Sequence, residues 1–263
     1  MIDSHCHLNF DSIKDDFKNI ISRAKDNGVT CILSINTRIK DFQEHYELIN
    51  NYNSLFISFG IHPSNVDEDN LISVEKIISL SNREKVIAIG ETGLDFYLNE
   101  NNVNNQIISF ENHIESSYKT GLPLIIHQRN SEEKIMEILE FYQKKESLKV
   151  VFHCFTGSSK LRDFCLDNNY YISLSGIVTF KNAQELRNTI SNVPIENILI
   201  ETDSPFLAPV PKRGKSNEPS YVFFIAEYLS NFYQISFEEF NQIIDNNFYK
   251  LFSKAKRYNQ ISL

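Results

Sequence analysis

The run IDSHCHLNF, residues 2–10, is the first strand-like stretch of the chain and bears most directly on the fold. In a β-strand alternate side chains share a face, so Asp3, His5 and His7 would point the same way. A doubly wound open sheet more often carries a glycine-rich phosphate turn after its first strand, and this chain has two histidines there. The stretch therefore argues against an open sheet and indicates a polar site at the end of the first strand.

Short β-rich runs alternate with longer helical patterns along the rest of the chain. The eight predicted strands cover residues 2–8, 29–35, 55–62, 86–92, 122–127, 149–155, 170–176 and 197–203. Helical stretches include 12–27, 41–51, 103–120, 131–145, 181–192 and 219–231, and a final amphipathic helix is predicted near 236–253. Eight βα units in series predict an α/β fold, a (β/α)8 TIM-like barrel with an extra C-terminal helix. No linker or internal repeat interrupts it, so we expect one barrel domain over 1–263.

The composition narrows the class of protein. The 263 residues are 41% hydrophobic and 23% charged, as in a soluble globular protein. The net charge of −8 argues against a broad surface for duplex DNA or for a membrane. The sequence contains no signal-peptide pattern, and its four cysteines include no C-x-x-C pair. We therefore expect a cytoplasmic protein without membrane contacts, whose cysteines are packing residues.

Polar side chains concentrate at the ends of the predicted strands, where (β/α)8 barrels place their active sites. Five of the seven histidines fall there, which a random scatter would not produce. The strand-end residues are His5, His7, His62, Glu91, Asp95, His127, Arg129, His153, Glu201 and Asp203.

Imidazoles and carboxylates that converge on a barrel mouth are typical of a metal site. His5 and His7 offer two ligands from one strand, and Asp203 follows the last strand, which closes against the first. His127 and His153 follow two neighbouring strands and offer ligands for a second ion. The predicted metal ligands are His5, His7, Glu91, His127, His153 and Asp203, with Glu91 in the bridging position. We expect two divalent metal ions, and histidine-rich ligand sets favour Zn²⁺, Mn²⁺ or Fe²⁺ over Mg²⁺.

Other polar residues receive different interpretations. Glu201 shares a face with Asp203 and is expected to orient a ligating histidine from behind. Cys6 and Cys154 have the opposite parity from their histidine neighbours and are not expected to be ligands. His45 and His113 lie within helical stretches and are read as surface or packing residues. Asp3 lies deeper on the inward face and is expected to bond to backbone or to a polar neighbour.

Six short motifs resemble the TatD family of metal-dependent deoxyribonucleases, which belongs to the amidohydrolase-like metal-dependent hydrolases. In chain order they are HCHLNF, GIHP, IGETGLDFY, HQR, HCFTGS and ETDSPFLAP, and RGKSNEPSYV at 213–222 is similar to a further block of that family. The resemblance covers about residues 1–250. It implies a barrel with two divalent ions, and its ligand positions match the six residues that strand-end position indicates.

The resemblance also implies phosphodiester hydrolysis in DNA, often as a 3′→5′ exonuclease on single-stranded ends. His62 and Arg129 match the family pattern and would contact the phosphate. Arg213, in the basic loop after the last strand, is a further substrate-binding candidate, and Tyr97 is a candidate for stacking on a base. Asp203 is assigned the role of general base.

Two alternatives stay open at this stage. One barrel site of this kind serves many chemistries, so the same site would also suit another ester or amide, for example in an aminoacyl-tRNA deacylase. A metal-bearing scaffold without activity is the non-enzymatic alternative, although no predicted ligand position is degenerate.

Overall fold

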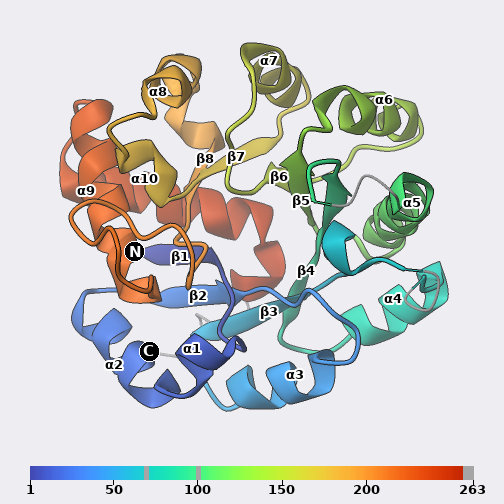
Figure 1. Ribbon diagram of the computed structural model, residues 1–263, viewed down its shortest axis with the longest axis horizontal. Coiled ribbons are helices and arrows are strands. Elements are labelled where there is room, and N and C mark those ends of the chain that lie inside the picture. Colours follow the sequence, from blue (N-terminus) through green and yellow to red (C-terminus); the bar gives the residue numbers. More distant parts are fainter. Residues whose placement is uncertain (68–70, 99–101, 257–263) are drawn as a thin grey trace.

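The structure, a computed structural model, describes residues 1–67, 71–98 and 102–256. Within these residues eight parallel strands form one sheet in the order β1 to β8, and the sheet is a nearly closed barrel (Figure 1). The predicted α/β barrel is therefore confirmed.

The strands are shorter than most of the predicted runs. They are β1 Ile2–Cys6, β2 Cys31–Ser34, β3 Leu55–Phe59, β4 Val86–Asp95, β5 Leu124–Arg129, β6 Val150–Phe152, β7 Tyr171–Leu174 and β8 Ile198–Ile200. Cys154 and Asp203, beyond the ends of β6 and β8, have left-handed backbones with φ of 43° and 54°. Residues in that conformation cannot continue a strand, so the predicted runs 149–155 and 197–203 extend too far.

Helices surround the strands on the outside of the barrel (Figure 1). They are α1 Asp11–Lys14, α2 Phe17–Asp26, α3 Phe42–Asn50, α4 Val74–Ser81, α5 Val103–Thr120, α6 Glu132–Gln143, α7 Ser159–Asp167, α8 Gln184–Ile190, α9 Val222–Phe232 and α10 Phe237–Leu251. The predicted helix 12–27 is divided into α1 and α2, whereas the extra C-terminal helix is present as α10. In the described part of the chain, no helix combines the length and apolar character that crossing a bilayer requires.

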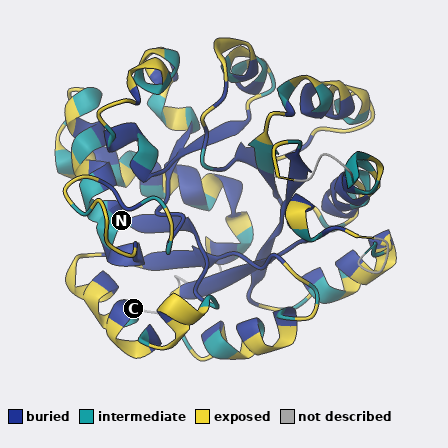
Figure 2. Ribbon diagram, viewed as in Figure 1, coloured by how far each residue is buried: buried dark blue, intermediate teal, exposed yellow. Residues whose placement is uncertain are grey.

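Two apolar clusters lie on the two sides of the strands. Along β2, Ile32 belongs to the cluster that contains the helices, while Leu33 belongs to a second cluster of strand residues, as the alternation of a strand requires. The second cluster also contains Phe248 and Phe252, from α10 and the residue after it, so this segment closes the interior of the barrel at one end. Figure 2 shows the buried strands inside helices whose outer faces are exposed.

The first and last strands meet through backbone hydrogen bonds just beyond β8. The amide of Asp203 donates to the carbonyl of His5 over 2.9 Å, and the amide of His7 donates to the carbonyl of Ser204 over 2.8 Å. This closure places residues from the two ends of the sheet side by side at the C-terminal mouth of the barrel.

Candidate metal centre

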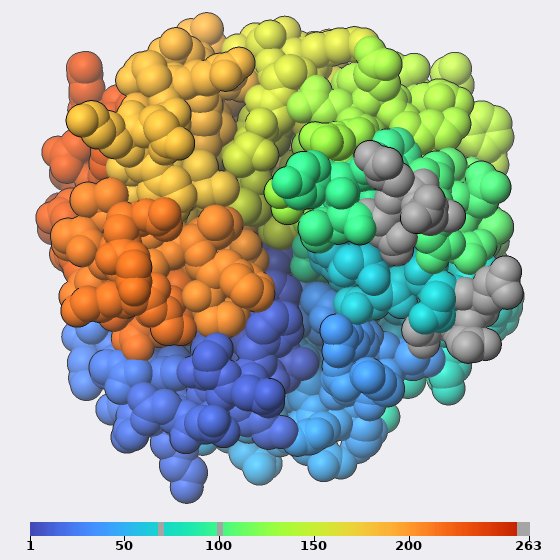
Figure 3. Space-filling model, in the orientation of Figure 1, coloured from blue at the N-terminus to red at the C-terminus, as the bar shows by residue number. Residues whose placement is uncertain are grey.

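A pocket of about 400 Å³ opens at the C-terminal ends of the strands. The space-filling view shows a hollow near the middle of this face, between blue, green and orange segments that are far apart in the sequence (Figure 3). The pocket is lined by His7, Phe10, Thr37, Arg38, His62, Ser64, Asn65, Glu91, Leu98, His127, Arg129, His153, Asp203 and Phe206. The structure therefore brings most of the predicted site residues together, with His5 buried beside them.

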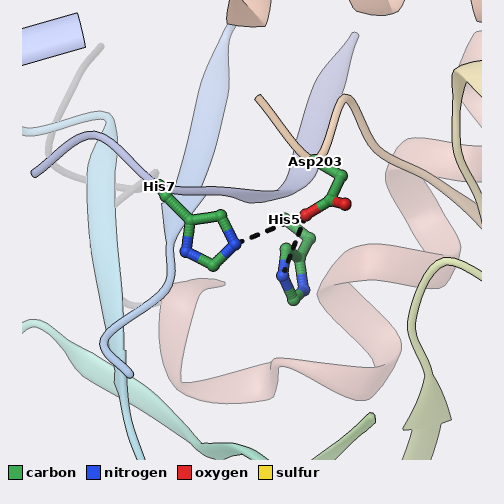
Figure 4. Close-up of side chains that lie close together, drawn as sticks. All are labelled: His5, His7 and Asp203. Carbon is green, nitrogen blue, oxygen red and sulfur yellow. Dashed lines mark ion pairs between the residues drawn. The ribbon is translucent and has the colours of Figure 1, made fainter. Parts of the chain in front are cut away.

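His5 and His7 face Asp203 across the closure between β1 and β8 (Figure 4). One carboxylate oxygen of Asp203, Oδ1, lies 3.3 Å from Nε2 of His7 and 3.7 Å from Nε2 of His5. The three side chains come from a strand and from a loop that is 196 or more positions further along the chain, so only the closed barrel places them together.

Glu91 occupies the centre of the cluster. Its Oε1 lies 2.6 Å from Nε2 of His153 and 2.9 Å from Nδ1 of His127. Its Oε2 points the other way and lies 3.6 Å from Nε2 of His5. Because its two oxygens face different histidines, the carboxylate is placed as a bridge between two cation positions.

Two glycines on β4 set the position of Glu91. Gly90 and Gly93 have φ of +129° and +139°, and a Cβ atom would lie 2.5 Å from the carbonyl oxygen of Ile125 and 2.1 Å from that of His127, respectively. Only glycine tolerates this backbone and this approach to β5. The register between β4 and β5 also shifts between Ile89 and Thr92. The GETG motif thus presses β4 against β5 and holds Glu91 beside His127.

The ligand atoms form three overlapping groups, each compact enough to hold an ion. Within each group all of the offered atoms lie within 4.8 Å of one another. The groups are His5, His7 and Asp203; His5, Glu91 and His153; and His62, Glu91 and His127. His62, which is expected to contact the phosphate, belongs to the last group and is therefore also placed as a candidate metal ligand.

Buried nitrogen atoms in this cluster fit a bound cation. Both ring nitrogens of His5 and Nδ1 of His7 are buried and have no hydrogen-bond partner among the described residues. A buried polar atom without a partner is costly, and neutral imidazole is the commonest metal ligand among the side chains. The donor set of imidazoles and carboxylates also suits Zn²⁺, Mn²⁺ or Fe²⁺.

The charges of the cluster support the same interpretation. Burial opposes ionisation of Glu91, but the imidazoles of His153, His62 and His127 outweigh it and hold the pKa of this carboxyl well below its usual value. Burial likewise opposes ionisation of Asp203, and His7 and His5 lower its pKa on balance. Burial lowers the pKa of His5, which keeps this imidazole neutral. Burial opposes protonation of His7, His127 and His153 too, but the neighbouring carboxylates outweigh it and raise the pKa of all three imidazoles. Metal binds anionic carboxylates and neutral imidazoles, so a bound cation would displace the protons of these three histidines.

Two carboxylates contact the ligating histidines from behind. Glu201 accepts a hydrogen bond from the Cys154 amide over 2.7 Å, and its Oε1 lies 3.5 Å from Nδ1 of His153. This is the place in which the sequence predicted it. Asp95, at the end of β4, lies 3.0 Å from Nε2 of His127 and was given no role in the sequence-based prediction. Its signal was its strand-end position in the GETGLD motif.

Asp3 is bound to the segment after β8 and not to the cluster. It accepts hydrogen bonds from the amide of Thr202 over 2.9 Å and from its hydroxyl over 2.6 Å. Burial raises the pKa of Asp3 to about 8 against these hydrogen bonds. The register of β1 shifts between Asp3 and Cys6, so alternation alone does not describe this strand.

The substrate-side candidates separate into two groups. Arg129 lines the pocket, and its guanidinium lies 4.0 Å from the ring centre of Tyr97, which is 59% exposed. Arg213 does not line the pocket. Its guanidinium lies 3.9 Å from the ring centre of Phe180 and donates to the carbonyl of Ala208.

The remaining histidines and cysteines are packing residues. His45 and His113 are fully buried, so the surface alternative is excluded. His113 donates from Nδ1 to the carbonyl of Ser109 over 2.6 Å. Cys6 lies in the apolar cluster on the helix side of the barrel, and Sγ of Cys154 lies 3.2 Å from the hydroxyl of Ser175. No cysteine of the described residues joins a metal-binding group.

A parallel barrel whose mouth gathers histidines and carboxylates around a central glutamate is the architecture of a metal-dependent hydrolase. The family model described as TatD related DNase matches residues 2–253. This chain belongs to the TatD family.

Relatives agree with that assignment. A metal-dependent hydrolase of Buchnera aphidicola subsp. Acyrthosiphon pisum is 40% identical over 263 residues, which cover 96% of this chain and 99% of the relative. The metal-dependent hydrolase YcfH of Escherichia coli K12 is 36% identical over 255 residues, covering 96% and 95%. The crystal structure of YjjV, a TatD homologue from Escherichia coli K12, superimposes with a TM-score of 0.88 at 26% identity and covers 96% of this chain and 98% of its own.

Proposed function

We propose that this barrel domain hydrolyses phosphodiester bonds at single-stranded DNA ends in the 3′→5′ direction, with two divalent metal ions. The central observation is the position of Glu91, whose two oxygens face different histidines. The description of the family model as a DNase supports a nucleic-acid substrate. In this proposal the ligands are His5, His7, Glu91, His127, His153 and Asp203.

Two bound cations would supply Lewis-acid activation of water and would neutralise charge on the phosphate. Asp203 is the general base, because its carboxyl is held ionised and lies at the pocket wall, where it accepts the proton of the attacking water. His153 is held in place by Glu201, and His127 by Asp95.

Arg129 contacts the non-bridging oxygens of the phosphate. Its planar guanidinium offers two parallel N–H donors, and stacking on Tyr97 restricts it to the edge of the pocket. His62 shares this edge, with its Nε2 3.3 Å from Nδ1 of His127, so it acts either on the phosphate or as a further ligand. Arg213 would reach the substrate only outside the pocket, after release from Phe180.

The acidic net charge of the protein is consistent with an exonuclease that acts at the end of a DNA strand. Such an enzyme contacts few phosphates, so it needs no broad basic surface. The local cations at the pocket are Arg38 and Arg129, together with the bound ions.

The test uses a single-stranded oligonucleotide labelled at its 5′ end, incubated with purified protein in Mg²⁺, in Mn²⁺ and in Zn²⁺. We expect a ladder that shortens from the 3′ end, and no product after chelation. Metal analysis of the same preparation identifies the bound ion. Hydrolysis of an aminoacyl ester without nucleotide release under any of the three metals would overturn the nuclease proposal in favour of the deacylase.

A further inference from the structure

A second cavity of about 570 Å³ lies directly beside the metal pocket, and we call it the flanking cavity. It shares Phe10, Thr37, Arg38 and Phe206 with the metal pocket, so the two are continuous. Its other walls come from the segment after β1, from α3 and from Pro205. Its volume is within the range of small-molecule sites, which is about 300–1,000 Å³.

Aromatic rings separate the flanking cavity from the metal pocket. Phe10 stacks on His7, with ring centres 4.9 Å apart. Phe206 meets Phe10 edge-on at 5.7 Å and is 50% exposed. A large apolar ring that is half exposed at the mouth of a barrel offers a flat surface to a planar ligand.

Neutral polar groups line the cavity and lack partners. His45 is fully buried, and among the described residues its Nδ1 makes no hydrogen bond. The Ser34 hydroxyl lies 2.6 Å from Nε2 of His45 and accepts a hydrogen bond from the Leu8 amide. The Oδ1 of Asn9 is also buried and without a partner in the described part of the chain. One nitrogen and one oxygen without a partner therefore lie in the wall of the cavity.

The charges favour a neutral group inside the cavity and an anion at its entrance. Asp11, Asp41 and Glu44 line the cavity, and of these Glu44 forms an ion pair with Lys14, which also lines it. The two remaining carboxylates would repel a phosphate there. Arg38 lies at the junction with the metal pocket, where its Nε donates to Oδ1 of Asn65 over 3.0 Å. Within the described residues its two terminal nitrogens form no hydrogen bond or ion pair, so they are available to a phosphate.

We infer that the flanking cavity binds the nucleoside next to the scissile phosphodiester, with its base against Phe206 and Phe10 and with the linking phosphate on Arg38. This inference rests on the proposed function and adds the position of a neighbouring nucleotide to it. Asn9, which is only partly buried, would contact the polar edge of the base. Contact through a ring face is tolerant of base identity, so we expect little sequence preference.

The test pairs a protein change with a substrate change. The substrates are an intact oligonucleotide and four variants of it, each with a single abasic residue at one of the first four positions from the cleaved end. Phe206→Ala and the wild type are compared on all of them. We expect Phe206→Ala to lower kcat/KM on the intact strand about tenfold, the loss typical of one stacking contact. One abasic position should cause a similar loss in the wild type, and Phe206→Ala should add little to it.

The matched control is Phe141→Ala, which removes a ring of similar exposure, 57%, from α6 and leaves all of these rates unchanged. A second variant, Asn9→Leu, should lower kcat/KM on the intact strand more than on bis(p-nitrophenyl) phosphate, which contains no nucleoside. If Phe206→Ala lowers kcat/KM by the same factor on the intact strand and on all four abasic strands, the flanking-cavity assignment is overturned although hydrolysis itself continues. If the wild type cleaves neither the oligonucleotide nor the small diester, the proposed function fails and the inference with it.

Discussion

The two ends of the barrel are built from the same eight strands, but they differ in the polarity and the hydrogen bonding of the side chains in their interior. At the N-terminal end the interior is filled by apolar side chains, including Phe248 and Phe252 from the C-terminal segment. At the C-terminal end it holds imidazoles and carboxylates, and several buried nitrogens, including both of His5, have no hydrogen-bond partner in the described chain.

The contrast indicates that residues important for stability and residues important for activity lie at opposite ends of the barrel. Closed apolar packing stabilises the fold, whereas buried polar atoms without partners cost free energy until a ligand satisfies them. Apolar packing at the N-terminal end therefore stabilises the barrel, and the side chains at the C-terminal end offer ligand atoms that a cation would satisfy. Substitutions at the two ends should have opposite signatures.

The largest effect is expected for Asp203→Asn. Loss of the general base should lower kcat on the oligonucleotide about 1,000-fold, within the range for removal of such a group. The unfolding midpoint should stay within a few degrees of the wild type, since the amide has the same shape. Steady-state kinetics and thermal unfolding check both parts.

The control carboxylate is Asp245, which pairs with the N-terminal amine over 3.4 Å at the opposite end of the barrel. Asp245→Asn should leave kcat unchanged. A wild-type rate in Asp203→Asn would remove the general-base assignment.

Phe252→Ala should have the reverse signature. Phe252 is 1% exposed, and truncation of a buried phenylalanine costs about 3–5 kcal/mol of unfolding free energy. Activity per folded molecule should be retained, because the change lies far from the mouth. Urea denaturation with an activity assay tests this, and Phe141→Ala on the surface should change stability by less than about 0.5 kcal/mol. Lost activity in the folded variant would contradict the separation of the two ends.

Metal addition should stabilise the C-terminal end. Chelator-treated protein should gain about 2.7 kcal/mol of unfolding free energy at a metal concentration 100 times the Kd. His5→Ala should lose most of this gain, since His5 belongs to two of the three metal-binding groups. Denaturant unfolding across a Mn²⁺ or Zn²⁺ titration is the measurement. An identical gain in the wild type and in His5→Ala would place the ion elsewhere.

The smallest effect concerns a histidine of the surrounding helices. Burial lowers the pKa of His113 to about 4, against about 6.5 in the unfolded chain. The unfolded state therefore takes up the proton first, and stability is lost as the pH falls from above 6.5 towards 4. Between pH 8 and pH 5 the wild type should lose about 2 kcal/mol more than His113→Gln. Urea unfolding at both pH values checks this, and parallel losses would exclude His113 as the source.

Much of the candidate site could be predicted because barrel chemistry follows strand ends. Each of the six predicted ligands stands at the end of a β-rich run or just after it, and a parallel barrel brings such ends to one mouth. The interpretation of Glu201 needed no more than its position two residues before Asp203.

Parity reasoning worked less well, because it assumes regular strands. β1 shifts register between Asp3 and Cys6, and β6 ends before His153, so strict alternation does not extend over either stretch. Arg213 shows a second limit, because a long side chain on a loop has several partners within reach. Its ring contact with Phe180 could not be read from a basic run.

The sequence by itself determined the eight-unit barrel and the family and supplied a set of six candidate ligands, because hydrophobic period and motif order are local properties of the chain. Only the tertiary structure decided which candidate ligand atoms lie close together, that Asp95 contacts His127, that His62 joins one of these groups and that a second cavity adjoins the first. These depend on distances between segments that are dozens to nearly two hundred residues apart. Such distances are set by strand register, by the approach of glycines on β4 to β5 and by the closure of β8 on β1.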